Sequence, residues 1–149
     1  MVYYSGTVAD IQLVLRSLSI GSGSLDSLND TQVEESQKKV DGDINVAMYV
    51  IYYTPLIQIT RNGVTAYPDP IPAMARRLVA ADLILNTMTG IDQNVIQTAQ
   101  NIAQEEIRRL YDLGSGIVGA SRLSGQLLKA RNRFTPAGIA PSPSPVQRV

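Results

Sequence analysis

Few side chains in this chain are of the types that carry out catalysis. The sequence contains no cysteine and no histidine, which removes thiol nucleophiles, imidazole bases and the usual zinc ligands together. Serines and tyrosines remain as candidate nucleophiles, but a serine needs a neighbouring base and no serine–lysine pair stands out. The adjacent acids Glu34-Glu35 and Glu105-Glu106 point about 100° apart on a helix, so the members of each pair do not share a substrate. We therefore expect no enzyme, no catalytic residue and no cofactor.

Asp41, Asp43 and Asn45 have the spacing of the first ligands of a calcium-binding loop. The match ends there, because Val46 occupies the position that needs glycine and Tyr52 the position of the bidentate glutamate. The three residues also fall inside a predicted helix. The pattern therefore favours a polar helix face, and we expect no metal site.

A second motif, Gly114 to Gly119, satisfies the G-x-G-x-x-G pattern of dinucleotide-binding loops. Such a loop follows a strand and is followed by an acidic residue about 20 positions later. Here a predicted helix precedes the glycines and no acidic residue follows them. A hinge or a helix terminator is the better interpretation.

The best-marked long helix is predicted from Thr31 to Thr54. Thr31 and Glu34 have capping-box spacing, and Pro55 ends the helix because it lacks an amide and disfavours a helical residue before it. Three tyrosines gather at its end. Its apolar stripe comprises Val33, Val40, Ile44, Ala47, Met48 and Ile51, and the tyrosines are Tyr49, Tyr52 and Tyr53.

Other elements are predicted on both sides of this helix. Thr7 opens a short helix, and residues 21–24 form a flexible break. A β-hairpin spans about residues 56–67 around Asn62-Gly63. A second long helix starts near Ile71 and ends at a left-handed cap at Gly90, with Asp82 as an edge ion pair, and a third runs from its cap, Asp92, to Gly114. Glu105 and Arg109 have the spacing of an i,i+4 pair.

The fold class that follows is mainly α: a small helical bundle of three long helices plus a short N-terminal helix, with one β-hairpin and an extended C-terminal arm. The 149 residues are enough for one domain with a real core. We divide it into a helical bundle, residues 1–114, and a C-terminal arm, residues 115–149.

The arm differs from the body in charge. All 13 acidic residues lie before residue 113, whereas residues 113–149 contain five basic residues. Such a tail suggests an acidic partner, although a solvated tail without a partner fits too. An amphipathic helix over Ser121–Phe134, through Leu123, Leu127 and Leu128, is compatible with the pattern, and an extended tail follows from Pro136.

No apolar run approaches the roughly 18 residues that a membrane span needs, and the first residues lack the plan of a signal peptide. We expect a soluble chain made in a cytoplasm, without a membrane partner.

The spacing of three motifs resembles a known family. They are Val40-Asp41-x-x-Ile44-Asn45, then Tyr52-Tyr53-x-Pro55-Leu56, then Pro70-Ile71-Pro72 opening an alanine-rich helix. Over about residues 5–115 the chain resembles the head–tail connector proteins, also called adaptor or head-completion proteins, of tailed bacteriophages. The well-marked hairpin and the long basic region after Gly114 depart from the family pattern.

The resemblance implies a ring, usually of twelve copies, beneath the portal protein in the neck of the virion. The ring lengthens the DNA channel, through which DNA passes without sequence-specific binding, and it docks the stopper or tail-terminator protein. The resemblance implies no catalytic residues. We expect Leu123, Leu127 and Leu128 to help seat the arm and Lys129, Arg131 and Arg133 to meet acidic portal surface. The alternative is a small helical DNA-binding or regulatory protein.

Overall fold

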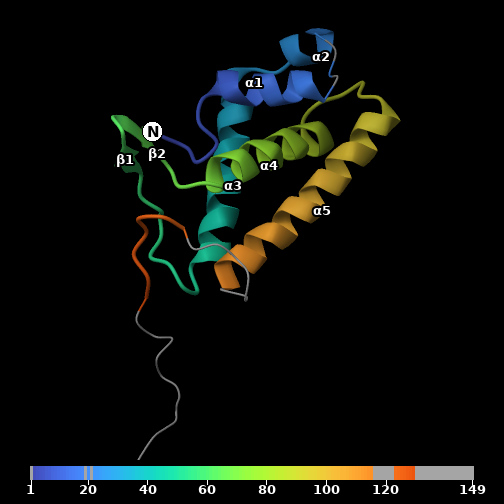
Figure 1. Cartoon of the computed structure of the whole chain (residues 1–149). Coiled ribbons are helices and arrows are strands. Elements are labelled where there is room, and N and C mark those ends of the chain that lie inside the picture. The colour runs from blue at the N-terminus through green and yellow to red at the C-terminus, as the bar shows by residue number, and fades with distance from the viewer. Residues whose placement is uncertain (1, 19, 21, 116–122, 130–149) are drawn as a thin grey trace, which may run out of the picture.

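The chain folds into packed helices from which one β-hairpin stands out (Figure 1). The computed structural model describes residues 2–18, 20, 22–115 and 123–129. Within these ranges the mainly α class with one two-stranded antiparallel hairpin is confirmed. The elements in chain order are α1 (Val8–Ser17), α2 (Ser22–Asp26), α3 (Asp30–Met48), β1 (Ile59–Arg61), β2 (Val64–Ala66), α4 (Ile71–Asn86) and α5 (Gln93–Ser115).

The short helix α1 begins where the sequence predicts. The Thr7 hydroxyl accepts a hydrogen bond from the Asp10 amide, and the Asp10 carboxylate accepts one from the Thr7 amide at 2.8 Å, which completes a capping box. The predicted flexible break at residues 21–24 is wrong, because α2 occupies most of it. Leu25 of α2 is buried in the core, and this contact holds the short helix in place.

The start of α3 differs from the prediction. Its N-cap is Asn29, whose side chain accepts from the Gln32 amide at 2.9 Å, while the Gln32 side chain accepts from the Asn29 amide at 3.0 Å. This reciprocal pair is the capping box that the sequence analysis placed at Thr31 and Glu34. The helix therefore starts at Asp30.

The end of α3 also comes earlier than predicted, at Met48 rather than Thr54. The amides of Ile51 and Tyr52 both turn back to the Met48 carbonyl, at 3.3 and 2.9 Å. The amide of Tyr53 then donates to the carbonyl of Leu127, at 3.0 Å, instead of to its own helix. A hydrogen bond from a distant segment thus replaces the next helical one.

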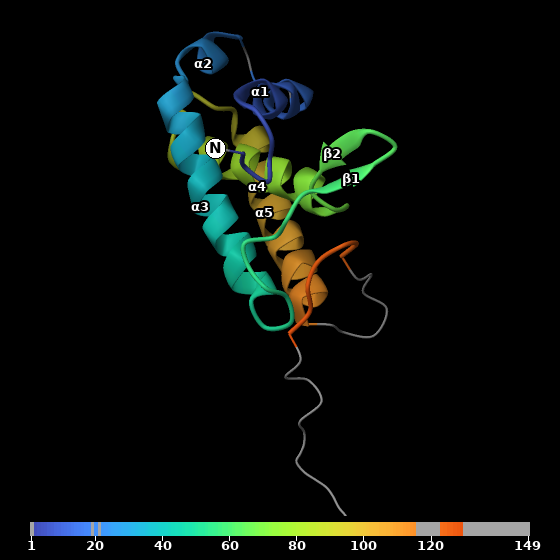
Figure 2. The ribbon, with the colours of Figure 1, turned by 90° about the vertical axis from the view of Figure 1, so that its left-hand side faces the viewer.

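The helix α4 is the centre of the bundle, in contact with α1, α3 and α5 (Figure 2). It begins at Ile71 with Pro72 in the first turn, where a missing amide costs nothing. It ends at Asn86, so the predicted cap at Gly90 is misplaced, although Gly90 does have a positive φ of 68° in the connection to α5. The buried residues of α4 are Ile71, Met74, Ala75, Leu78, Val79, Ala80, Ala81, Leu83 and Ile84.

The last turn of α5 crosses the end of α3 so closely that one residue has no room for a side chain. A Cβ added at Gly114 would lie 2.8 Å from the Ala47 carbonyl carbon and nearer still to its oxygen. The predicted terminator Gly114 lies inside the helix, which ends at Ser115. The packing of α5 on α3 therefore requires glycine at position 114. Gly116 and Gly119 lie outside the described residues.

The hairpin has the turn that the sequence predicts. Asn62 and Gly63 have positive φ values of 50° and 78°, which matches a two-residue turn of type I′. The strands pair Ile59 with Ala66 and Arg61 with Val64, so these four side chains share one face. Both strands are largely exposed, and the hairpin stands away from the helices in Figures 1 and 2.

Candidate functional site

Residues 123–129 return from the end of α5 to the end of α3 and are anchored there by hydrogen bonds. The Leu123 amide donates to the Tyr52 hydroxyl at 3.0 Å, and the Lys129 amide donates to the Ile51 carbonyl at 2.9 Å. The Gln126 side chain accepts from the Ile57 amide and donates to the Ile57 carbonyl, each at 2.8 Å. We call residues 123–129 the return segment.

The return segment is not the amphipathic helix that the sequence analysis considered over Ser121–Phe134. Its described residues form a turn at Ser124-Gly125, where Gly125 has a φ of 70°, and then an extended stretch. The prediction is wrong for these residues because their backbone groups bond to residues 51–57 instead of to one another. The rest of the predicted helix, and the tail from Pro136, lie outside the described residues.

The six residues expected to contact partners are placed very differently. Leu123 is buried in the core, whereas Leu127 and Leu128 are exposed on the return segment. The Lys129 ammonium lies 3.2 Å from the centroid of the Tyr49 ring, a cation–π contact. Arg131 and Arg133 lie outside the described residues.

The pairing of the two segments sorts their side chains onto two faces. Tyr52 pairs with Leu128, and successive residues of extended chain point to opposite sides, so Tyr53, Leu127 and Lys129 share the other side. Tyr52 is 1 % exposed, whereas Tyr53 and Leu127 are 56 % and 65 % exposed. The outward side is therefore an apolar surface with a cation on it. We call this surface the tyrosine patch, and it consists of Tyr49, Tyr53, Ile57, Leu127 and Lys129.

The three tyrosines stand out in the sequence, but their spacing assigns none of them to a surface. Periodicity alone did not separate the buried Tyr52 from the exposed Tyr49 and Tyr53, because the helix stops at Met48. The deciding contact comes from a segment more than 70 residues later in the chain. The available signal was the unusual density of tyrosine at the end of a helix.

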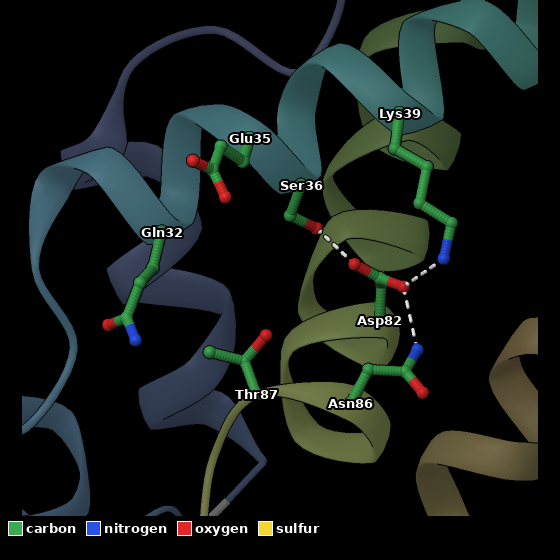
Figure 3. A pocket seen from close by; sticks show the side chains of 7 residues that line it. All are labelled: Gln32, Glu35, Ser36, Lys39, Asp82, Asn86 and Thr87. Carbon is green, nitrogen blue, oxygen red and sulfur yellow. Dashed lines mark hydrogen bonds and ion pairs between the residues drawn. The ribbon is translucent and has the colours of Figure 1, made fainter.

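A polar cleft of about 430 Å³ lies between α3 and α4, with Asp82 in its wall (Figure 3). The Asp82 carboxylate accepts hydrogen bonds from Ser36 at 2.6 Å, Lys39 at 2.7 Å and Asn86 at 2.8 Å. Burial acts to raise the pKa of Asp82, but these three donors outweigh it and hold the pKa below its ordinary value. The predicted edge ion pair is thus confirmed, with Lys39 as its partner.

This arrangement suits a structural role better than a chemical one. A general base needs a pKa near the working pH, whereas the pKa of Asp82 is lowered and its carboxylate already accepts hydrogen bonds from three donors. The other carboxylate of the cleft, Glu35, is exposed and lies apart from Asp82 in Figure 3. The cleft therefore ties α3 to α4.

A second polar cluster fixes the N-terminal residues to α3. Tyr4 donates its hydroxyl proton to Asn45 at 2.6 Å and accepts from the Leu56 amide at 2.7 Å, and burial raises its pKa to about 12. The Asp41 carboxylate accepts from the Tyr4 amide at 3.3 Å. Burial raises the pKa of Asp41 to about 6, although that hydrogen bond lowers it in part.

The calcium-like spacing of Asp41, Asp43 and Asn45 thus lies within α3, where Asp41 and Asn45 bind Tyr4. Among the residues that the structure describes, no cluster of three or more acidic, histidine or cysteine side chains is placed to hold a metal ion. The spacing therefore reflects a helix face that secures the N-terminus.

A buried carboxylate on α5 is satisfied by two arginines. Glu106 is 1 % exposed. Its carboxylate oxygen Oε1 lies 2.9 Å from a guanidinium nitrogen of Arg109 and 3.6 Å from one of Arg77 on α4. The sequence analysis paired Arg109 with Glu105 instead, which is wrong because the i,i+3 geometry brings Glu106 closer. These three side chains join α4 to α5, and the two arginines compensate the buried negative charge of Glu106.

Comparisons with protein-family models, with curated proteins and with solved structures found no match. None of the helices in the described ranges has the length and apolar character needed to cross a bilayer. Function must therefore be argued from the surfaces of the molecule.

Proposed function

We propose that this protein is a structural connector in the neck of a tailed bacteriophage particle. Copies join into a ring, of about twelve subunits as in the family it resembles, beneath the portal protein. The ring lengthens the DNA channel and offers a platform for the stopper or tail-terminator protein. The proposal adopts the family resemblance of the three sequence motifs.

One structural observation carries the proposal beyond the motifs. The return segment is bonded to the end of α3 at several points, which fix the position of Lys129 on the body. Every charged residue after Lys129 is basic. A basic chain attached to a rigid anchor suits docking onto an acidic protein surface, because anchoring reduces the ordering cost of binding.

The roles of the individual residues follow from this arrangement. Leu123, buried in the core, seats the base of the arm, whereas Leu127 and Leu128 are exposed and Leu127 lies on the outward side. Arg131 and Arg133, which follow, meet acidic portal surface. Because identical arms extend from each subunit of a ring, weak individual contacts add up through avidity.

Portal binding tests these roles. We expect the double substitution Arg131→Glu with Arg133→Glu to weaken binding to purified portal rings at least about tenfold, since two attractive charges become repulsive. Surface plasmon resonance at low and moderate salt measures this. Arg108→Glu is the control, because Arg108 is exposed on α5 and, among the described residues, forms an ion pair with its neighbour Asp112 alone. Equal binding by the double variant would refute the assignment of the arm.

The ion pairs of the helices weigh against the alternative of a DNA-binding protein. Lys39, Arg76, Arg77 and Arg109 each lie within 4 Å of a carboxylate, so most of the positive charge on α3, α4 and α5 is paired with a negative charge. A salt-titrated DNA-binding assay distinguishes the two functions. Submicromolar affinity with a steep salt dependence would favour the DNA-binding protein, because phosphate contacts release counterions.

A further inference from the structure

The tyrosine patch is larger than the scattered apolar residues of an ordinary surface. Its tyrosines are 62 % and 56 % exposed, Ile57 is 50 % exposed and Leu127 is 65 % exposed. Together they present on the order of 400 Å² of apolar surface, which is the size of the largest patch on a typical monomer, and such patches are often functional. Exposed tyrosine is also among the residues that dominate binding energy at protein interfaces.

Hydrogen bonds and a cation–π contact hold the residues of the patch in place. Tyr53 and Leu127 are joined through their backbones at 3.0 Å, Ile57 is bracketed by Gln126, and Lys129 lies over Tyr49. A surface fixed in this way loses little conformational entropy when a partner covers it. Its charge is positive at Lys129.

The opposite end of the molecule has the complementary character. The helices α1 and α2 lie together beside the start of α3 (Figures 1 and 2). The exposed acids of α2 and early α3 take part in none of the ion pairs between described residues. These acids are Asp26, Asp30, Glu34 and Glu35. An exposed leucine, Leu13, lies nearby in the chain on α1. We call the end that contains these acids and Leu13 the acidic end.

The two ends do not meet within one molecule. The 19 residues of α3 separate them, a length of about 28 Å at the helical rise. Lys129 is tied to residue 51 beyond the far end of this helix. Any contact between the two ends is therefore a contact between molecules.

We propose that the tyrosine patch is the docking site for the acidic end of a second copy of this chain. Tyr49, Tyr53 and Leu127 pack against the exposed Leu13, and Lys129 faces Asp26 and Glu34. Each copy has one patch and one acidic end, so the contact is head-to-tail and repeats from copy to copy. Such a contact closes into a ring when its rotation allows. The inference deepens the proposed function by naming the faces that join its subunits.

Sedimentation velocity of the full chain tests the proposal. We expect the wild-type protein to associate as its concentration rises, and Tyr49→Ser with Tyr53→Ser to remain a monomer. Asp26→Lys with Glu34→Lys should remain a monomer as well, because reversed charges repel Lys129. The matched control is Tyr111→Ser, which removes a tyrosine of similar exposure, 52 %, from α5 and should associate as the wild type does.

Mixing the two double variants gives the sharpest result. The first keeps an intact acidic end and the second an intact patch, so an equimolar mixture should form one-to-one dimers that grow no further. If patch instead meets patch, the charge-reversed variant alone will dimerise, and the proposal is overturned. Circular dichroism of each variant confirms folding, and Leu127→Glu provides a second patch variant should the tyrosine pair unfold.

Two outcomes separate this proposal from the proposed function. If the faces behave as described but the protein is absent from phage particles, only the connector function fails. If particles contain it and the variants associate as the wild type does, only the assignment of faces fails. A wild-type chain that remains monomeric up to about 1 mM, the weak limit of specific contacts, also overturns the assignment.

Discussion

Gly114 is a residue whose size determines how closely two helices approach. A Cβ at this position would run into the backbone of Ala47, which has no flexible end to move aside. We expect Gly114→Ala to destabilise the protein by about 1–3 kcal/mol, the cost of overpacking a tight contact. Urea unfolding followed by circular dichroism measures it.

Gly42 in the middle of α3 is the matched control. A Cβ there meets nothing within 4 Å, and alanine suits a helix interior better than glycine by about 1 kcal/mol. Gly42→Ala should therefore stabilise the protein. If both substitutions shift the unfolding midpoint in the same direction, the close crossing of α3 and α5 is wrong.

Asp41 makes stability depend on pH. Burial raises its pKa to about 6 in the folded protein, above the ordinary value of 3.8. The folded state then binds the proton more tightly than the unfolded state, so the ionised Asp41 lowers stability above about pH 6, and this penalty is relieved as the pH falls toward 4. Asp10 and Asp82 act in the opposite sense, since their lowered pKa values give stability that is lost as the pH falls through and below 4.

The substitution Asp41→Asn tests this sign. The amide oxygen still accepts from the Tyr4 amide but carries no charge, so the variant should exceed the wild type in stability at about pH 8 and lose that advantage as the pH falls to about 4. Urea unfolding across this range measures the difference. If the difference in stability between the variant and the wild type does not change with pH, the pKa of Asp41 is not raised in the folded protein.

At the scale of elements, the return segment is the feature that joins the chain after α5 to residues 51–57 at the end of α3. Leu123 is 4 % exposed in the core, whereas Leu127 on the same segment is 65 % exposed. Leu123→Ala should therefore cost about 2–4 kcal/mol through lost burial and a cavity, while Leu127→Ala should change stability by less than about 0.5 kcal/mol. Thermal and urea unfolding of the pair measure this contrast. Equal effects would mean that the segment is not anchored as described.

Local sequence signals predicted the elements whose structure is itself local. The Asn62-Gly63 turn, the Thr7 cap and the apolar stripe of α4 depend on neighbouring residues and appear as expected. The end of α3 and the course of residues 123–129 were predicted wrongly. Both depend on hydrogen bonds between residues 51–57 and the return segment, and no window of neighbouring residues contains both partners.

The candidate surfaces were predictable only in part for the same reason. Composition located the basic region after residue 112 and the tyrosines near the end of α3. It did not show that Lys129 lies over Tyr49, or that Leu123 is buried while Leu127 is exposed. These facts depend on the turn at Ser124-Gly125, which separates Leu123 from the extended stretch, and on the pairing of Tyr52 with Leu128, which places Leu127 and Lys129 on the outward side.

At the scale of the whole molecule, charge and apolar surface are distributed unevenly. The acidic end lies beside α1 and α2, and the tyrosine patch lies at the far end of α3 with the basic chain leaving from it. A subunit with different ends is suited to directional assembly, in which each copy receives one neighbour and presents a surface to the next. This is the property that a connector ring requires.

Imaging of purified phage particles tests the connector function most directly. Cryo-electron microscopy of the neck should show a ring of about twelve copies of this fold beneath the portal, as closed point-group symmetry requires, with the chain after Lys129 of each copy directed at portal surface. Absence of the protein from the particles, or its presence as scattered copies away from the portal, would contradict the account.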